Sequence, residues 1–297
     1  MSVPHRPDRP IATTSLPLPG VALVLVGLLA SFPALAQDEP ELGWSDKAEL
    51  SFVGIDGNSE STTLGFKNEL KRDWENATLV FSASALRSES TSFQRFAIGT
   101  PDDFQLVERS SSELTAEKYS LGLRYDRDLS ERTYWFAGAE WTRNEFAGYD
   151  SRTVATAGVG NTWWEGDDGH FKTDYGLTYT TQDDLIANPQ VEDSFLGVRF
   201  GWDYARPFGN AEYTNVLVLD GNVDESEDVR ADMTNAIAVS MTDRLALKVS
   251  LQWLYDNLPA LTRVALLDQD EQPTGESVVR ELAALDQVLT VALVVRL

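Results

Sequence analysis

The 297-residue chain lacks cysteine and has only two histidines. Without cysteine it can form no disulfide, thiolate metal site or cysteine nucleophile. His5 lies near the N-terminus and His170 follows Asp167 to Gly169 in a predicted turn, so no second histidine is placed to complete a metal site or a catalytic pair. We therefore predict no enzyme, catalytic residue, metal site or cofactor, and we interpret His170 as an exposed turn residue. Chemistry by carboxylates alone stays open, because acidic residues are abundant.

Basic residues are also scarce, with 24 Lys and Arg against 47 Asp and Glu. Nucleic-acid binding is disfavoured because it needs a basic surface. A hydrophobic content of 42% and an aromatic content of 10% are too high for a disordered chain. The acidic runs 220–228 and 268–271 offer oxygen ligands for Ca²⁺ or Mg²⁺, but their spacing does not match an EF-hand loop. We interpret both runs as solvated acidic loops.

Long apolar runs are absent after residue 37, so the chain beyond that point has no helical membrane span. Before it, Arg6 and Arg9 precede the apolar run 21–30, and Ala34-Leu35-Ala36 has small residues at the positions that a signal peptidase requires. This pattern predicts a cleavable signal peptide over residues 1–36, with an uncleaved membrane anchor as the alternative. We expect residues 37–297 to form one exported domain.

Period-two alternation of apolar and polar residues is the dominant pattern of this domain, as in 245–255, where every second residue is Leu, Val, Trp or Tyr. Most of the predicted strands are about 10–13 residues long, whereas strands of soluble proteins average about five or six. Strands of this length suit a membrane, which a tilted strand crosses in about 9–11 residues. The predicted strands are 47–55, 61–72, 76–87, 116–127, 132–143, 153–164, 170–180, 194–205, 210–220, 229–240, 244–255 and 285–297.

Short and long connections alternate along the chain. The connections at 73–75, 128–131, 165–169, 206–209 and 241–243 are short, and those at 88–115, 144–152, 181–193, 221–228 and 256–284 are longer. This alternation, with aromatic residues near both ends of the strands, is typical of a transmembrane antiparallel up-and-down β-barrel. Both termini fall at the short-turn end, which requires an even number of strands. We predict twelve strands, and ten is the alternative number. A soluble β-sandwich is the alternative fold.

In such a barrel the polar face of each strand lines the lumen. Twelve strands enclose a wider lumen than the eight-strand barrels that side chains just fill. We expect it to hold water or to be closed by ion pairs and the long loop 88–115. The predicted lumen-lining residues are Glu49, Lys67, Glu69, Lys118, Arg124, Glu140, Lys172, Asp174, Arg199, Asp203, Asp232 and Lys248.

Three segments resemble one known family. They are "FVGIDGNSESTTLGF" with its Gly57-Asn58 turn, "GVGNTWW" at 158–164 and "MTDRLALKVSLQWLYDNLPA" at 241–260. They are similar to the opening hairpin, a glycine-rich middle strand and the penultimate strand of the domain of unknown function 481, or YdiY-like salt-induced outer membrane protein, family. The resemblance implies an outer-membrane barrel linked to salt or osmotic conditions, and it implies no residue roles. Outer-membrane barrels commonly end in an aromatic residue, whereas this chain ends in Leu297.

The sequence thus predicts a non-enzymatic protein of the Gram-negative outer membrane, either a narrow channel or an envelope protein that responds to salt or osmotic conditions. The alternatives are a lipid- or peptide-hydrolysing barrel and a soluble periplasmic binding module. The expected partners are outer-membrane lipids and lipopolysaccharide, the barrel assembly machinery during insertion, and small solutes or ions.

Overall fold

The computed structural model describes residues 42–55, 59–100, 103–189, 192–269 and 272–297. The predicted signal peptide lies outside these ranges. Within them almost every residue belongs to a strand or a short turn, and one 3-10 turn, η1 (Glu145–Ala147), interrupts the pattern. No helix among the described residues is long and apolar enough to cross a membrane.

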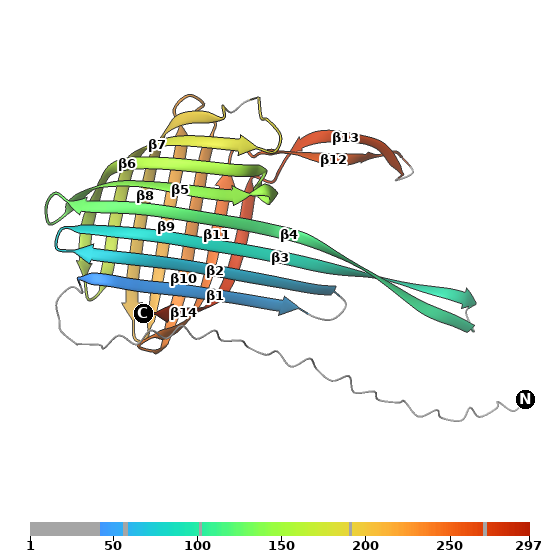
Figure 1. The fold of residues 1–297 in the computed structure, drawn as a ribbon, viewed down its shortest axis with the longest axis horizontal. Coiled ribbons are helices and arrows are strands. Elements are labelled where there is room, and N and C mark those ends of the chain that lie inside the picture. Colours follow the sequence, from blue (N-terminus) through green and yellow to red (C-terminus); the bar gives the residue numbers. More distant parts are fainter. Residues whose placement is uncertain (1–41, 56–58, 101–102, 190–191, 270–271) are drawn as a thin grey trace, which may run out of the picture. The chain divides into compact units, whose positions relative to one another are not determined.

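Twelve antiparallel strands close into a barrel in the order β1-β14-β11-β10-β9-β8-β7-β6-β5-β4-β3-β2 (Figure 1). Each strand pairs with its neighbour along the chain, apart from the step between β11 and β14, and β1 closes the ring against β14. This arrangement confirms the predicted twelve-strand barrel and rules out the sandwich. The barrel strands are β1 (Gly43–Ile55), β2 (Ser59–Trp74), β3 (Ala77–Thr100), β4 (Asp103–Asp128), β5 (Thr133–Asn144), β6 (Tyr149–Gly166), β7 (Gly169–Asp184), β8 (Ser194–Phe208), β9 (Ala211–Asn222), β10 (Val229–Thr242), β11 (Leu245–Asp256) and β14 (Leu285–Arg296).

The two ends of the barrel differ in their connections. At one end of the barrel the strands are linked by short turns, at residues 75–76, 129–132, 167–168, 209–210 and 243–244. The start of β1 and the end of β14, the two strands that close the ring, lie at the same end. Gly209 in one of these turns has a φ of 63°, a conformation that glycine adopts without steric cost. Leu297 exchanges two backbone hydrogen bonds with Asp46, so the last residue takes part in closing the barrel.

Two predicted loops are strands instead. The segment predicted as the long loop 88–115 belongs to β3 and β4, which are 24 and 26 residues long. β3 continues past Ser92, the last residue that pairs with β2, and β4 begins well before Tyr119, the first residue that pairs with β5. The two strands therefore extend beyond the rest of the barrel as a hairpin (Figure 1). The second, 256–284, contains a separate two-stranded sheet of β12 (Leu261–Leu267) and β13 (Pro273–Glu281). Cross-strand pairing of polar residues such as Thr91 and Ser112 holds the β3–β4 extension in register without apolar alternation, which is why period-two counting missed it.

The outer wall of the barrel is apolar. Large side chains at alternate positions are exposed there, for example Leu177 and Leu289 at 68% and Leu196 at 59%. Residues between them, such as Phe195 and Thr178, are buried toward the interior. The apolar face of the alternating strands therefore covers the outside of the barrel rather than a core between two sheets.

Candidate functional site in the barrel lumen

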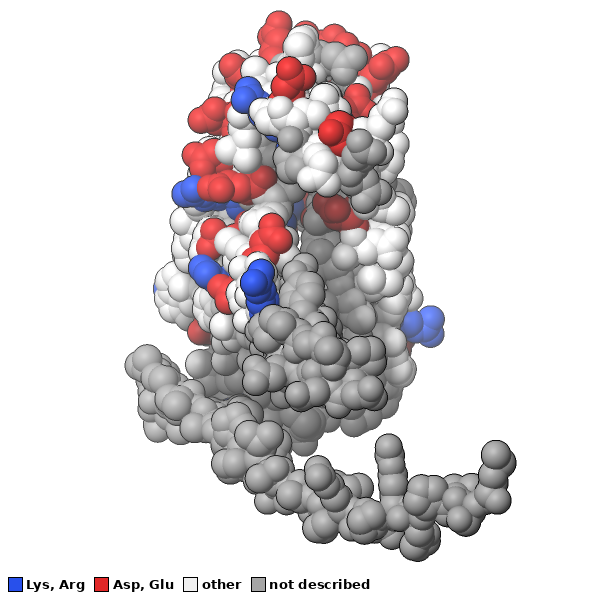
Figure 2. Space-filling model, turned by 90° about the vertical axis from the view of Figure 1, so that its right-hand side faces the viewer, with Lys and Arg blue, Asp and Glu red and all other residues white. Residues whose placement is uncertain are grey.

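The lumen contains a cavity of about 240 Å³ at the end with the long connections, which we call the mouth cavity. It is lined by residues from β4 to β11 and from β14. Four of the twelve predicted lumen residues line it: Lys118, Glu140, Arg199 and Asp232. The surface at this end is mainly acidic where it is described (Figure 2). The charged lining residues that the sequence did not single out are Arg152, Asp220, Arg230, Asp256 and Asp286.

Two arginines of the cavity wall are neutralised by neighbouring carboxylates. Arg199 donates from Nε and Nη2 to the two carboxylate oxygens of Asp220, at 2.6 and 2.7 Å. Arg230 donates in the same forked way to Asp228, at 3.0 and 2.9 Å. Such bidentate pairs fix the orientation of both partners. These two arginines are therefore held against the wall.

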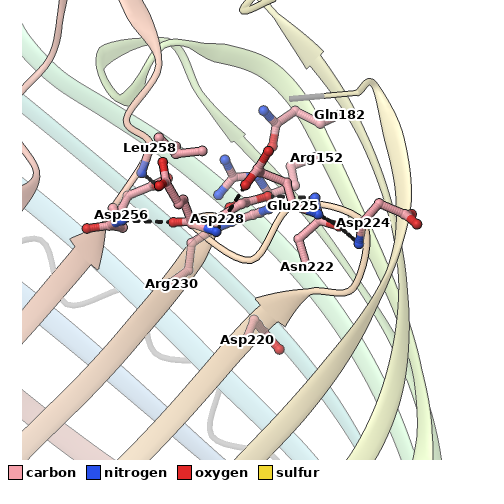
Figure 3. A network of polar contacts seen from close by, with 12 residues as sticks. Arg152, Gln182, Asp220, Asn222, Asp224, Glu225, Asp228, Arg230, Asp256 and Leu258 are labelled. Carbon is pink, nitrogen blue, oxygen red and sulfur yellow. Dashed lines mark hydrogen bonds and ion pairs between the residues drawn. The ribbon is translucent and has the colours of Figure 1, made fainter. Parts of the chain in front are cut away.

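In the predicted solvated acidic loop at 220–228, Asp224 and Glu227 are exposed, and Asp228 is the exception. Its side chain is only 2% exposed, and it accepts a further hydrogen bond from Asn222 Nδ2 at 3.0 Å (Figure 3). Asn222 Oδ1 in turn accepts from the backbone N–H groups of Asp224 and Glu225. A buried carboxylate is stable only when it is paired in this manner. Asp228 therefore anchors the acidic run next to the cavity, which residues 220–222 line.

Arg152 of β6 is held differently. Its Nε donates to Gln182 Oε1 at 2.6 Å, and Gln182 Nε2 donates to Asp184 Oδ1 at 2.6 Å. The Tyr149 ring lies against the guanidinium face, 4.1 Å from ring centroid to Cζ. In the part of the chain that the structure describes, no carboxylate lies within ion-pair distance of Arg152 and its Nη atoms make no hydrogen bond. The residue is thus a fixed cation without a direct ion pair, and the carboxylates of Asp184 and Asp256 act on it from beyond ion-pair distance.

Nearer the short turns, an ion pair links strands across the lumen. Arg124 of β4 donates from Nη1 to Asp174 Oδ2 of β7 at 2.7 Å and from Nε to Asp126 at 2.7 Å. Asp174 Oδ1 also accepts from the Tyr134 hydroxyl of β5 at 2.7 Å. Tyr134 is buried, and its hydroxyl points to this ion pair in the lumen. Together with Phe136, these residues form what we call the inner network.

Glycines make room for the aromatic rings of the inner network. A Cβ atom at Gly160 would overlap the Tyr134 ring, and one at Gly158 would lie 2.9 Å from Phe136 Cζ. Phe136 is only 3% exposed and its ring also lies under Arg124, 4.2 Å from centroid to Cζ. The glycine-rich stretch of β6 therefore lets two large rings fill this part of the lumen.

A second ion pair links two strands next to the point where the ring closes. Lys248 of β11 donates to both carboxylate oxygens of Glu49 of β1, at 2.8 and 3.0 Å, across the intervening β14. Lys67 and Glu69 of β2 are in register with Glu49 and Lys47. These residues thus lie on the same face of neighbouring strands.

The remaining predicted lumen residues lie near the short turns. Lys172 donates to Glu165 at 2.9 Å, and Asp203 Oδ1 lies 3.2 Å from His170 Nε2. His170 is part of β7 rather than a turn, and its side chain is 28% exposed, so the interpretation as an exposed turn residue is wrong. The predicted strand 170–180 already began at this residue, so the error was to assign it to the preceding turn.

No group of three or more His, Asp or Glu side chains within the described ranges is arranged to hold a metal ion. The acidic run 268–271 lies partly outside these ranges.

The sequence matches a family model, "Protein of unknown function, DUF481", over residues 48–263. The chain belongs to this family. The matched region includes eleven of the twelve barrel strands wholly or in part and every residue of the inner network. The expected family is confirmed.

One curated relative and several solved barrel structures are similar to the chain. The "Uncharacterized protein YdiY" of Escherichia coli (strain K12) is 22% identical over 254 residues, which cover 82% of this chain and 90% of the relative. Among solved structures, the NanC porin is 9% identical, with a TM-score of 0.43 and coverage of 84% and 98% of the two chains. The translocator domain of the autotransporter NalP from Neisseria meningitidis is 11% identical, with a TM-score of 0.43 and coverage of 88% and 90%.

The residues that the sequence missed lie at strand ends. Arg152 and Asp256 were assigned to loops, because the apolar alternation of β6 and β11 stops before these strands end. Inward-facing aromatic residues were missed for another reason. Alternation marks two faces but does not say that a ring as large as Tyr134 fits inside, and only the glycines opposite it could have indicated this.

Proposed function

We propose that the protein is a non-enzymatic outer-membrane barrel whose lumen is a narrow path for small ions and polar solutes. The observation that carries this proposal is the combination of a closed apolar outer wall with a charged lumen that holds a cavity of about 240 Å³ at one end. Polar linings and rings of charge are what channels use to pass and select solutes.

Membrane insertion is supported by the physics of the outer wall. Exposed rows of Leu, Val and aromatic side chains would be costly in water, and a closed barrel leaves no unpaired strand edge in hydrocarbon. On this proposal the outer wall contacts lipid and lipopolysaccharide, and the barrel assembly machinery inserts it. The short turns then lie in the periplasm and the mouth cavity faces outward. The signal peptide at 1–36 and the link to salt or osmotic conditions belong to the same proposal.

The path is narrow because the inner network fills part of the lumen. Tyr134, Phe136 and the Arg124–Asp174 pair reach across β4 to β7, and Glu49–Lys248 spans three strands on another side. A twelve-strand barrel without such filling would have a wider lumen than an eight-strand barrel. We therefore expect a small conductance rather than that of a wide porin.

Planar-bilayer recording of the purified, folded protein tests the proposal. We expect small single-channel currents in the wild type and larger ones in a Tyr134→Ala/Phe136→Ala variant, whose lumen has lost two rings. Trp135→Ala is the matched control, because Trp135 lies between them on β5 and is exposed on the outer wall. If neither the folded wild type nor the folded double variant gives a current, the protein is not a channel.

The proposal that the protein is not an enzyme is supported by the position of the single histidine among the described residues. His170 lies beside Asp203 near the short turns, at the end opposite the mouth cavity. A hydrolase of surface lipids or peptides that uses a histidine base would need it at the outer end. Turnover of phospholipid or peptide substrates by the folded protein, lost on replacement of one external acid or serine, would overturn this part of the proposal.

A further inference from the structure

The mouth cavity has an uneven distribution of uncompensated charge. Arg199 and Arg230 are neutralised by Asp220 and Asp228, as described above. On the β4–β6 side, Lys118 and Glu140 carry opposite charges, and Arg152 is the lining arginine that has no ion pair among the described residues.

The opposite side carries the excess negative charge. Asp256 of β11 and Asp286 of β14 line the same cavity, and neither forms an ion pair among the described residues. In the ring, β14 lies opposite β6, because β7 to β11 separate them one way and β5 to β1 the other. Within the described residues, the cavity lining thus contains Arg152, which has no ion pair, and three carboxylates without one, Asp232, Asp256 and Asp286. Asp256 is in register with Arg230 on the neighbouring strand.

Arg152 is shaped to bind a carboxylate. Gln182 fixes its Nε and Tyr149 covers its face, so the edge with both Nη atoms is the part left for a ligand. That edge offers the two parallel N–H donors that a carboxylate accepts in a bidentate pair. A guanidinium that is already oriented loses little side-chain entropy on binding.

Asp256 provides the complementary group within reach of one small molecule. Arg152 and Asp256 both line the mouth cavity and a smaller polar pocket beside it, yet they are not within ion-pair distance of each other (Figure 3). Asp256 Oδ1 accepts from the backbone N–H of Leu258, which holds the carboxylate in place. A ligand with a carboxylate at one end and a cation at the other would pair with both groups.

We propose that the mouth cavity binds small zwitterionic solutes, with their carboxylate on Arg152 and their cationic group toward Asp256 and Asp286. A volume of about 240 Å³ is below the range of roughly 300–1,000 Å³ typical of pockets for drug-sized ligands, so the ligand is small. This inference names the solute class of the proposed lumen path and rests on that function, but binding itself needs no conduction.

Ligand-detected NMR titration of the detergent-folded full chain tests the proposal with three probes: glycine, acetate and methylammonium. We expect glycine to bind more tightly than either singly charged probe, because only glycine satisfies both walls. Arg152→Gln should weaken glycine binding by about tenfold or more, the effect of losing hydrogen bonds between charged groups. Asp256→Asn should weaken glycine binding and leave acetate binding equal or stronger.

Arg244→Gln is the matched control, because Arg244 lies in a short turn at the other end of the barrel. It should bind glycine like the wild type. Heat-modifiable migration on a gel verifies that each variant is folded. If Arg152→Gln does not fold, the effect of Asp256→Asn on glycine binding still tests the proposal.

The outcomes separate this proposal from the channel. Glycine binding that depends on Arg152 supports it even in a barrel that carries no current. Equal binding of glycine and acetate, or wild-type glycine binding in folded Arg152→Gln, would overturn it even in a barrel that conducts.

Discussion

The two halves of the lumen use the same residue types in different ways. In the inner network, Arg124, Asp174 and Tyr134 bind one another and Phe136 fills the remaining space. In the mouth cavity, Arg152 faces open volume across from unpaired carboxylates. Alternating strands place polar groups inside at both levels, so the difference comes from spacing across the ring. In the inner network every charged group has a partner, whereas in the mouth cavity Arg199 and Arg230 are ion-paired and, within the described residues, Arg152 is not.

The largest effect is expected from Asp174→Ala in the inner network. It leaves the Arg124 guanidinium and the Tyr134 hydroxyl without their shared acceptor. The ion pair is half-buried, and loss of the acceptor for these two donors, one of them charged, costs about 2–3 kcal/mol. Urea unfolding in lipid vesicles, followed by tryptophan fluorescence, measures the loss. Asp203→Ala is the control, because that carboxylate is 52% exposed and should change stability by no more than about 1 kcal/mol. An equal loss of unfolding free energy in the two variants would show that the inner network does not depend on its ion pair.

A smaller effect is expected from Gly160→Ala. The added methyl group overlaps the Tyr134 ring, and overpacking of this kind costs about 1–3 kcal/mol. The same unfolding measurement applies. Gly166→Ala in the same strand is the matched control, since nothing lies within 4 Å of a Cβ there. A Gly160→Ala barrel as stable as this control would show that the rings do not fill the lumen tightly.

The smallest effect is expected from Lys118→Gln at the mouth cavity. Lys118 forms no ion pair among the described residues, so its replacement leaves no buried partner behind. We expect a change in unfolding free energy within about 0.5 kcal/mol. A loss as large as that of Asp174→Ala would mean that the mouth is held together as firmly as the inner network, and the comparison would fail.

Much of the fold was predictable because strand physics is local. The period-two pattern located all twelve barrel strands. The alternation of short and long connections predicted a closed ring with an even number of strands, whose first strand starts and last strand ends at the same end of the barrel. The β3–β4 extension and the β12–β13 sheet were missed, since polar pairs such as Thr91 and Ser112 carry no apolar alternation. The candidate site was predicted only in part. Lys118, Glu140, Arg199 and Asp232 were named, but Arg152 and Asp256 were not.

The sequence by itself determined which side chains face inward, because successive residues of a strand point to opposite faces. It also determined the family and the absence of cysteine chemistry. Only the tertiary structure decided which inward charges meet. Glu49 and Lys248 are 199 residues apart in the chain and 2.8 Å apart in the lumen, whereas Arg152 ends beside a neutral amide. Contacts across a closed ring depend on its register and on the sizes of all the residues between the walls, and no local pattern carries that information.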